Sequence, residues 1–407
     1  MGSIRKINCV WSLFFFSLIF VGESQVSKQF VQTRNTQFVF NGSTFVFNGF
    51  NSYWMMSVAA DISQRSKVSN VFAQAKTAGL NVCRTIAFGE GSNPSALQTS
   101  PGIYNENVLQ GLDFVVSEAR KYNVKLIISL VNNFKDLGGR LQYVQWARDA
   151  GVPIRSPDDF YSNKIIKGYY KNHVKKILTR VNTITKIAYK DDPIIMAWQL
   201  MNEPRCEPRN AKQLHGWIQE MATYVKSIDN KHLLSIGMEG FYGEETPDRK
   251  QYNPSNYTVG TEFVKNHLVK EIDFTTIHAY PDRWVSSTND KVRMRFLQRW
   301  IAIHTSDSMR IVKKPLILGE FGRIIKGNNI KYRDSFMIEA YWYIYNYAKS
   351  SKGGLAGGLV WQLTSEGMES YADGYQIVLS QNPSTKTILR NQSARMLSLQ
   401  QPLATLN

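Results

Sequence analysis

The chain has 407 residues, of which 43% are hydrophobic and 20% are charged. These proportions are typical of a globular protein with a full apolar core, and they exclude a disordered chain or a small disulfide-stabilised protein. Lys and Arg together number 49 against 32 for Asp and Glu, which gives a formal net charge of +17. The excess indicates either a solvated basic surface or affinity for an acidic partner. No zinc-finger, phosphate-loop or RNA-binding motif accompanies it, so a nucleic-acid-binding function is disfavoured.

Residues 1–24 have the pattern of a secretory signal peptide. Two basic residues precede an apolar run over residues 10–21, which is short for a membrane span. Ser24 and another small residue two positions earlier suit cleavage before Gln25. We therefore expect a secreted, extracellular mature chain of residues 25–407 that does not enter the membrane. An uncleaved membrane anchor is the alternative.

Two cysteines remain in the predicted mature chain, Cys83 and Cys206, and neither lies in a metal-binding spacing. They follow two predicted strands that are not adjacent, so we expect free thiols. Asn-x-Ser/Thr sequons occur at Asn41, Asn256 and Asn391, which are candidate glycosylation sites in a secreted protein.

Strand and helix patterns alternate along the chain after an N-terminal β-hairpin. The hairpin is predicted over residues 38–47 from an Asn-Gly turn between apolar residues. The predicted strands cover residues 45–51, 81–87, 124–131, 194–200, 232–238, 273–279, 315–319 and 357–362. The predicted helices cover residues 70–78, 105–122, 164–188, 211–228, 261–269, 290–306, 333–349 and 385–397.

Eight strand–helix pairs with continuous apolar strands indicate a parallel sheet covered by helices. At this length they favour a single α/β domain, a closed (β/α)8 barrel with an N-terminal hairpin, over an open doubly wound sheet. No Gly-x-Gly-x-x-Gly follows the first strand, which weakens a nucleotide-binding alternative. In such a barrel the chemistry takes place at the carboxyl ends of the strands.

Two glutamates stand at strand ends that are expected to face each other across the barrel mouth. Glu203 follows the fourth predicted strand and Glu320 the seventh. Two opposed carboxylates can cleave a glycosidic bond, because one protonates the leaving oxygen while the other attacks the sugar or activates water. Either glutamate alone is explained equally well as a salt-bridge partner. The pair favours a glycosidase.

Other polar side chains at strand ends can separate the acidities of these carboxyl groups. Arg84, His278 and Tyr280 are expected near Glu320, where a cation and hydrogen-bond donors would keep it ionised as a nucleophile. Glu203 would then need a less charged setting to retain its proton. No set of His and Cys ligands is present, so we expect neither a metal nor another cofactor.

Aromatic residues near the strand ends are candidate sugar platforms. Trp361 follows the eighth predicted strand and is expected at the barrel mouth. Trp54, Tyr143, Trp146 and Trp284 fall in loops predicted at the same end and are weaker candidates, since large aromatic residues are often core residues.

The segments around both glutamates resemble glycoside hydrolase family 5, a family of retaining (β/α)8 enzymes, and within it the plant endo-β-mannanases. Residues 197–206, Ala-Trp-Gln-Leu-Met-Asn-Glu-Pro-Arg-Cys, resemble the acid/base motif. Residues 315–322, Pro-Leu-Ile-Leu-Gly-Glu-Phe-Gly, resemble the nucleophile motif. The similarity extends to residues 49–54, 82–85, 132–143 and 273–284. It implies endo-acting hydrolysis of β-1,4-mannosidic bonds in mannan, glucomannan and galactomannan of the plant cell wall.

The resemblance also implies a role for each matching residue. Glu203 is the general acid/base and Glu320 the nucleophile. The remaining roles concern substrate and nucleophile: Asn202 binds the sugar 2-hydroxyl, Trp361 is the ring platform, and Arg84, His278 and Tyr280 orient the nucleophile. We expect a monomer whose partners are the polysaccharide and, through its charge, acidic wall polymers.

Three positions depart from the family pattern. Gln199 replaces a usual Glu, Ile86 a usual Trp, and Phe134 a frequent Trp. None of these changes removes a catalytic group. They leave two alternatives open: hydrolysis of another β-1,4-linked polysaccharide, or a catalytically weakened barrel that binds wall polysaccharide.

Overall fold

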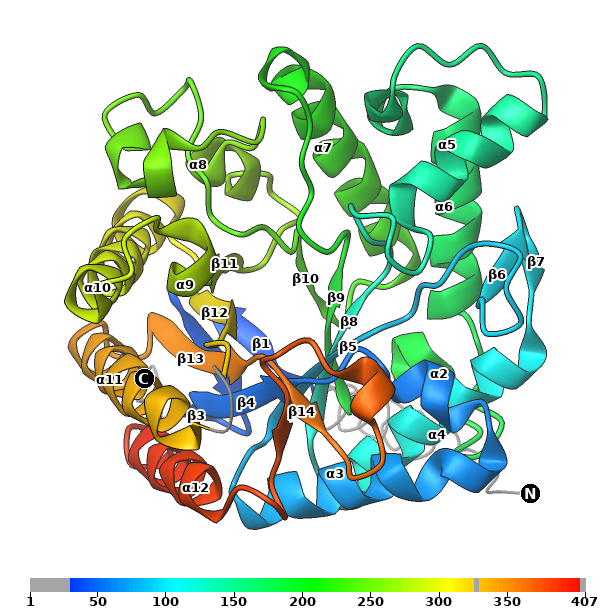
Figure 1. Ribbon diagram of the computed structural model, residues 1–407. Coiled ribbons are helices and arrows are strands. Elements are labelled where there is room, and N and C mark those ends of the chain that lie inside the picture. The colour runs from blue at the N-terminus through cyan, green and yellow to red at the C-terminus, as the bar shows by residue number, and fades with distance from the viewer. Residues whose placement is uncertain (1–29, 326–328, 403–407) are drawn as a thin grey trace, which may run out of the picture.

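The computed structural model describes residues 30–325 and 329–402 (Figure 1). The predicted signal peptide lies outside these residues. Within them, eight parallel strands form the central sheet in the order β10-β9-β8-β5-β4-β13-β12-β11. Their bounds are β4 Phe47–Asn51, β5 Val82–Ile86, β8 Lys125–Ser129, β9 Ile195–Gln199, β10 Leu233–Ser235, β11 Thr275–Ala279, β12 Leu316–Phe321 and β13 Leu355–Val360. Every residue of these strands is buried, as expected for a sheet covered on both faces.

Backbone hydrogen bonds between β10 and β11 close the sheet into a barrel. The Asp273 N–H donates to the Leu234 carbonyl over 2.8 Å, and the His278 N–H donates to the Glu239 carbonyl over 2.9 Å. The predicted (β/α)8 barrel is thus confirmed.

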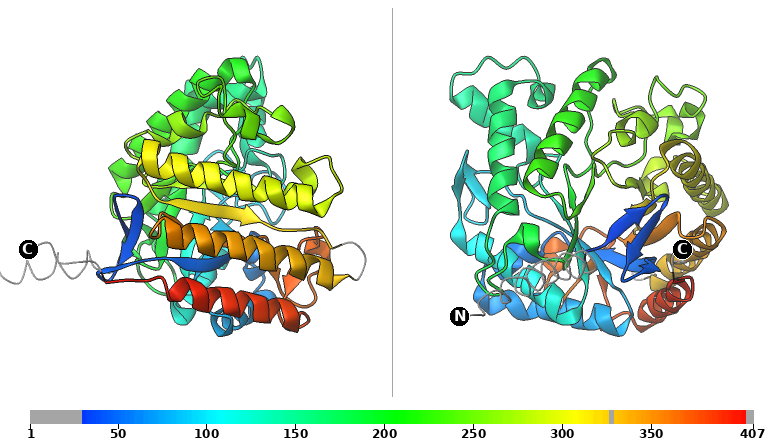
Figure 2. Two further views of the ribbon diagram at one scale, coloured as in Figure 1. Left: turned by 90° about the vertical axis from the view of Figure 1, so that its left-hand side faces the viewer. Right: turned by 180° about the vertical axis from the view of Figure 1, so that it is seen from behind.

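Helices surround the barrel, and Figure 2 shows α10, α11 and α12 side by side along one flank. The longer helices are α3 Arg65–Thr77, α4 Glu106–Tyr122, α5 Gly139–Asp149, α6 Lys164–Leu178, α7 Ala211–Ile228, α10 Asp290–Asp307, α11 Ile330–Ser350 and α12 Pro383–Leu397. Shorter ones are α2 Met55–Ala59, α8 Phe263–His267 and α9 Pro281–Trp284. Local sequence sets their ends: the Asn105 side chain caps α4, and Asn123 ends it in the left-handed conformation.

One predicted helix is too long. The apolar pattern predicted a helix over residues 164–188, but α6 ends at Leu178. Beyond it, the Asn182 side chain accepts hydrogen bonds from the backbone N–H groups of Ile184 and Thr185 at 2.8 and 3.0 Å. Such bonds offer the backbone an alternative to the helix, and a periodic pattern of apolar residues does not reveal them.

The N-terminal hairpin covers the amino-terminal end of the barrel (Figure 2). Its turn places Asn41 and Gly42 at φ values of 51° and 75°, as a tight Asn-Gly turn requires. Phe38 packs edge-on against Phe274, with ring centroids 5.2 Å apart. The predicted hairpin is confirmed, and a further strand extends it; the bounds are β1 Gln32–Arg34, β2 Gln37–Phe40 and β3 Ser43–Thr44.

Cys83 and Cys206 are both buried and free, as predicted. The three sequon asparagines are exposed, and their glycosylation stays a prediction. Within residues 30–325 and 329–402, no helix combines the length and apolar character that a membrane crossing needs.

Candidate active site

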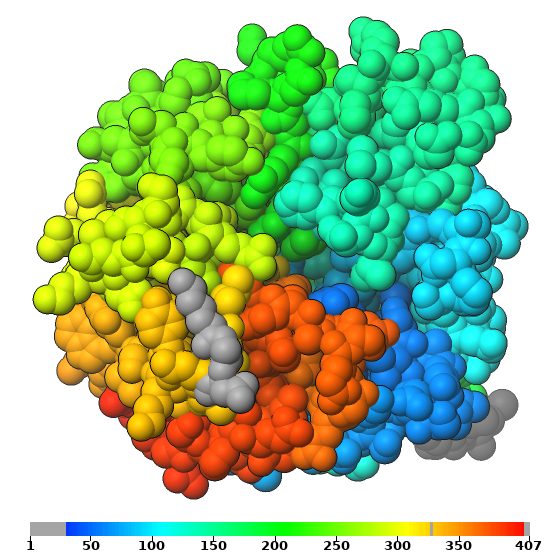
Figure 3. All heavy atoms as spheres, viewed as in Figure 1, coloured from blue at the N-terminus to red at the C-terminus, as the bar shows by residue number. Residues whose placement is uncertain are grey.

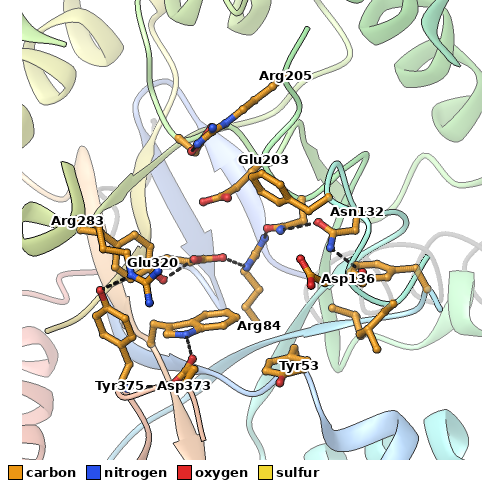
Figure 4. Close-up of a pocket in the computed structure, with 18 of the residues that line it drawn as sticks. Tyr53, Arg84, Asn132, Asp136, Glu203, Arg205, Arg283, Glu320, Asp373 and Tyr375 are labelled. Carbon is orange, nitrogen blue, oxygen red and sulfur yellow. Dashed lines mark hydrogen bonds and ion pairs between the residues drawn. The ribbon is translucent and has the colours of Figure 1, made fainter. Parts of the chain in front are cut away.

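A cleft of about 840 Å³ opens at the carboxyl ends of the barrel strands, where Figure 3 shows the molecule hollowed near its centre. Its lining includes both predicted catalytic glutamates, Glu203 and Glu320 (Figure 4). Arg84, Asn202 and four cleft residues beyond β11 and β13 join them: Tyr280, Trp284, Trp361 and Tyr375. The sequence therefore located the site, because the ends of parallel strands meet at one end of a barrel.

Glu320 is held by a hydrogen-bond donor on each of its oxygens. The Arg84 Nη1 group donates to Oε1 over 2.5 Å, and the Tyr280 hydroxyl donates to Oε2 over 2.6 Å. Burial and the charge of Glu320 raise the pKa of Tyr280 well above its ordinary value, so this phenol stays a donor. Arg84 and Tyr280 thus lie against Glu320 as predicted, and the two contacts fix its direction into the cleft.

Amide oxygens fix the position of Arg84. Its Nε group donates to Gln199 Oε1 over 2.7 Å, Nη1 to Asn51 Oδ1 over 3.1 Å, and Nη2 to Asn202 Oδ1 over 2.7 Å. Asn202 in turn donates through Nδ2 to Asn132 Oδ1 over 3.0 Å. An amide Nδ2 group carries two hydrogens, and Asn132 takes only one from Asn202 at the cleft surface.

Glu203 lies four residues beyond the end of β9 and has a left-handed backbone, with φ of 50°. This conformation costs energy for a residue with a Cβ atom, and strained residues of this kind cluster at functional sites. Its N–H donates to the Gly237 carbonyl over 2.9 Å, which fixes the strained turn. The side chain therefore enters the cleft from a backbone position that this hydrogen bond holds.

His278 contacts Glu203 more closely than Glu320. Its Nδ1 atom lies 2.6 Å from Glu203 Oε1 and 3.6 Å from Glu320 Oε2. His278 therefore lies at ion-pair distance from Glu320, as expected, but its nearer partner is Glu203. His278 and Glu203 both lie near strand ends, where many side chains are close together. Which of them pair therefore depends on side-chain direction and not on sequence position.

The expected weakly charged setting of Glu203 is wrong. Burial acts to raise its pKa, but the hydrogen bond and charge of His278, followed by Arg205 and Arg84, outweigh burial and hold the pKa below its ordinary value. His278 thus favours the ionised form of Glu203 rather than the protonated form.

One carboxylate oxygen from each glutamate and a ring nitrogen of His278 lie within 4.8 Å of one another. These atom types also suit a metal ion. Here, however, Arg84 and Tyr280 already donate to both oxygens of Glu320, and the buried guanidinium disfavours a second cation beside it. The residues fit an acid/base pair better than a metal site.

A third carboxylate in the cleft, Glu239, pairs with Arg205. Arg205 donates to both of its oxygens, and the Nε bond measures 3.0 Å. Burial and the charge of Glu203 raise the pKa of Glu239 to about 8. Arg205 also lies over the Phe134 ring, 5.2 Å from its centroid. Glu239 directly follows the predicted strand over residues 232–238, and Arg205 lies in the acid/base motif over residues 197–206, but the sequence analysis assigned no role to either residue.

Trp361 borders the cleft as predicted, and contacts with Asp373 and Tyr53 fix its orientation. Its Nε1 group donates to Asp373 Oδ2 over 2.6 Å, and its ring lies nearly parallel to Tyr53, with centroids 5.7 Å apart. Trp54 does not reach the cleft: it is fully buried and donates to the Leu363 carbonyl over 2.9 Å. The prediction for Trp54 is wrong, since the chain turns into α2 here and presents Tyr53 instead.

Two other aromatic candidates also belong to the core. Tyr143 and Trp146 are buried on α5, where they pack against each other outside the cleft lining. Trp284 does line the cleft, and so do Ile86 and Phe134, two of the three positions that depart from the family pattern.

Several lining residues were missed by sequence reasoning. They lie in irregular loops or, for Arg283, in the short helix α9, where no apolar periodicity marks them: Tyr53, Phe88, Asp136, Leu137, Arg283, Asp373 and Tyr375. Leu137 shows why: its exposed side chain rests on a left-handed backbone, with φ of 61°, which a pattern of residue types does not indicate for leucine.

Comparisons with known proteins agree with this geometry. A family model described as GH family 5 beta-mannosidase-like matches residues 28–375. The chain belongs to glycoside hydrolase family 5. Its family membership makes it a hydrolase of glycosidic bonds.

Relatives within glycoside hydrolase family 5 cover almost the whole chain. The tomato protein Mannan endo-1,4-beta-mannosidase 5 is 54% identical over 406 residues, 97% of each chain. The rice protein Mannan endo-1,4-beta-mannosidase 1 is 48% identical and covers 92% of this chain and 88% of its own. The solved endo-1,4-beta-mannanase of Rhizomucor miehei has 29% identity and a TM-score of 0.75, covering 91% of this chain and 99% of its own.

Proposed function

We propose that this protein is a secreted, retaining endo-β-1,4-mannanase that acts on mannan, glucomannan and galactomannan of the plant cell wall. The observation that carries the proposal is the pairing of Glu203 and Glu320 beside His278, within 4.8 Å, in a cleft open at the strand ends. The tomato and rice relatives named as mannan endo-1,4-beta-mannosidases support mannan as the substrate.

In the first step, a Glu320 oxygen attacks the anomeric carbon of a mannosyl unit. The glycosidic C–O bond breaks, and Glu203 gives its proton to the leaving oxygen. Arg84 and Tyr280 hold Glu320 in line for this attack. The shortened chain leaves, and the remaining sugar is an ester of Glu320.

In the second step, water attacks the same carbon and restores the catalyst. Glu203 accepts a proton from the water, the new C–O bond forms, and the ester bond to Glu320 breaks. The close carboxylates support this retaining route, because inverting enzymes separate theirs by about 6.5–9.5 Å to admit a water. Another sugar hydroxyl can replace water and give transfer.

Secretion rests on the signal-peptide pattern of residues 1–24. The net charge of +17 supports electrostatic retention by acidic wall polymers, and we propose that the mature enzyme acts as a monomer. Retention of this kind weakens as salt screens the charges, so elution from a wall preparation by salt tests it. Salt-insensitive retention contradicts it.

The experiment that tests the activity follows viscosity and new reducing ends together on galactomannan, with xylan and a β-1,4-glucan in parallel. Internal cleavage predicts a fast fall in viscosity with few new ends on the mannan. Cleavage confined to another backbone would identify a different β-1,4-glycanase. Binding without turnover by a folded protein would identify a polysaccharide-binding barrel weakened at Ile86, Phe134 or Gln199.

A further inference from the structure

The buried guanidinium of Arg84 has an uneven set of partners. It is 4% exposed and donates to four side chains. Three of these are neutral amides, Asn51, Gln199 and Asn202, and the fourth is the carboxylate of Glu320. Among the residues that the structure describes, Glu320 is thus the one ionised side chain in hydrogen-bond contact with Arg84.

Among the described residues, the side-chain oxygen of Gln199 has hydrogen-bond partners and its side-chain nitrogen has none. Its Oε1 atom accepts from Arg84 Nε and from Ser129 Oγ, both over 2.7 Å, which fixes the amide orientation. Its Nε2 group is buried and has no acceptor within residues 30–325 and 329–402. An unpaired buried donor is unfavourable.

Glutamate would fit the same space equally well by local criteria. It has nearly the same volume and accepts the same two hydrogen bonds, and its second oxygen would be buried without a partner as Nε2 is. Packing and hydrogen bonding therefore do not explain the amide of Gln199. What glutamine provides and glutamate does not is an acceptor without charge, and a residue that breaks a local rule next to a reacting group indicates a functional reason.

We propose that Gln199 is a positioning residue that orients Arg84 without neutralising it, so that the guanidinium charge is committed to Glu320. The inference rests on the proposed function, because it takes Glu320 as the nucleophile. When Glu320 becomes an ester, Arg84 loses its one ionised partner while it stays buried, which disfavours the covalent intermediate. Attack by water breaks the ester bond and restores the carboxylate, so hydrolysis recovers the ion pair.

The other charges around Glu320 come from different elements and are unchanged by substitution at Gln199. His278 faces Glu320 from β11, and Tyr280 from the residue that follows β11. Glu203 lies in the segment after β9, and Glu239 in the segment after β10. A carboxylate at position 199 would add a negative charge on the far side of Arg84. It would share the guanidinium and weaken the electrostatic support that Arg84 gives to the Glu320 carboxylate.

The test compares Gln199→Glu and Gln199→Met with the wild-type protein on a β-1,4-mannan oligosaccharide, using kcat/KM against pH. In Gln199→Glu we expect the acidic limb to move to higher pH by about one unit. A trapped glycosyl-enzyme should also accumulate to a larger fraction by intact-mass measurement. Gln199→Met removes the acceptor without adding charge, so kcat should fall about tenfold while the acidic limb stays in place.

Thermal unfolding of each variant separates misfolding from a change in chemistry. Coincident acidic limbs for wild type and Gln199→Glu would overturn the inference, and so would equal shifts in both variants. Absence of mannan cleavage by the wild-type protein would instead overturn the proposed function, and it is seen before any variant is made.

Discussion

Nδ1 of His278 lies 2.6 Å from Oε1 of Glu203, closer by a full ångström than to the nearest oxygen of Glu320. His278, expected from the sequence beside Glu320, thus has Glu203 as its nearer partner. The contact has a direct chemical consequence, because it stabilises the anionic form of Glu203, the proposed proton donor.

Replacing His278 should therefore change the alkaline limb of the pH–rate profile. In His278→Gln the stabilisation of ionised Glu203 is weakened, so the pKa of Glu203 rises and its proton is retained to higher pH. We expect the alkaline limb of kcat/KM to move upward by about one pH unit. An alkaline limb that stays in place or moves downward would show that His278 does not control this acidity.

Replacing Glu203 and replacing Glu320 should affect turnover in different ways. Glu203→Gln should reduce turnover of mannan about 10²–10⁴-fold, because the leaving oxygen is no longer protonated. Glu320→Ala should abolish turnover and covalent labelling by an activated 2-fluoro mannoside, since no carboxylate remains to form the ester. Peptide mass spectrometry of the labelled wild type checks that the sugar is on Glu320.

A matched control for these variants is Glu220→Gln on the outer wall of the barrel. Glu220 pairs there with Lys167 and Lys171 at a half-buried surface position, and ion pairs at the surface contribute little to stability. This variant should keep wild-type turnover. Normal turnover in Glu203→Gln or Glu320→Ala would refute the assigned roles.

Asp373 should control the sugar platform without touching the reacting atoms. It accepts from Trp361 Nε1 over 2.6 Å and from Gln362 Nε2 over 3.0 Å. Asp373→Ala frees the Trp361 ring to rotate, so we expect a loss of about 10–100-fold in kcat/KM. Asp373→Asn retains an acceptor oxygen and should lose less. Equal losses in the two variants, or none in either, would show that this hydrogen bond does not orient the ring.

Glu90 should make the stability of the fold depend on pH. It is 2% exposed, and burial raises its pKa from 4.5 to about 8 against the opposing hydrogen bond from Gly139. Between these values the unfolded chain releases the proton while the folded protein retains it. The contribution of Glu90 to the free energy of unfolding is therefore fully present below about pH 4.5. It is lost as the pH rises towards 8, by at most about 1.4 kcal/mol per pH unit.

Thermal unfolding from pH 5 to pH 8 measures this contribution. Glu90→Gln cannot ionise, so its unfolding temperature should fall less over this range than that of the wild type. Parallel curves for the two proteins would contradict the assignment. Activity is a useful second measurement, since Gly139 follows the cleft loop that carries Leu137.

The sequence by itself determined the barrel and the two glutamates. Eight strand–helix alternations are local patterns of apolar residues, and a (β/α)8 barrel brings all eight strand ends to one face whatever the loops do. Glu203 and Glu320 needed only their positions after the fourth and seventh strands to be found. The free thiols of Cys83 and Cys206 followed from the same strand order.

Only the tertiary structure decided which side chains meet. Whether Tyr53 or Trp54 faces the cleft depends on how the chain turns after β4, and strand periodicity no longer applies there. Likewise, Gln199 is close to Glu203 in sequence but bonds to Arg84. Pairings of this kind are set by side-chain direction and by contacts between strands more than 100 residues apart, and neither leaves a periodic signal in the sequence.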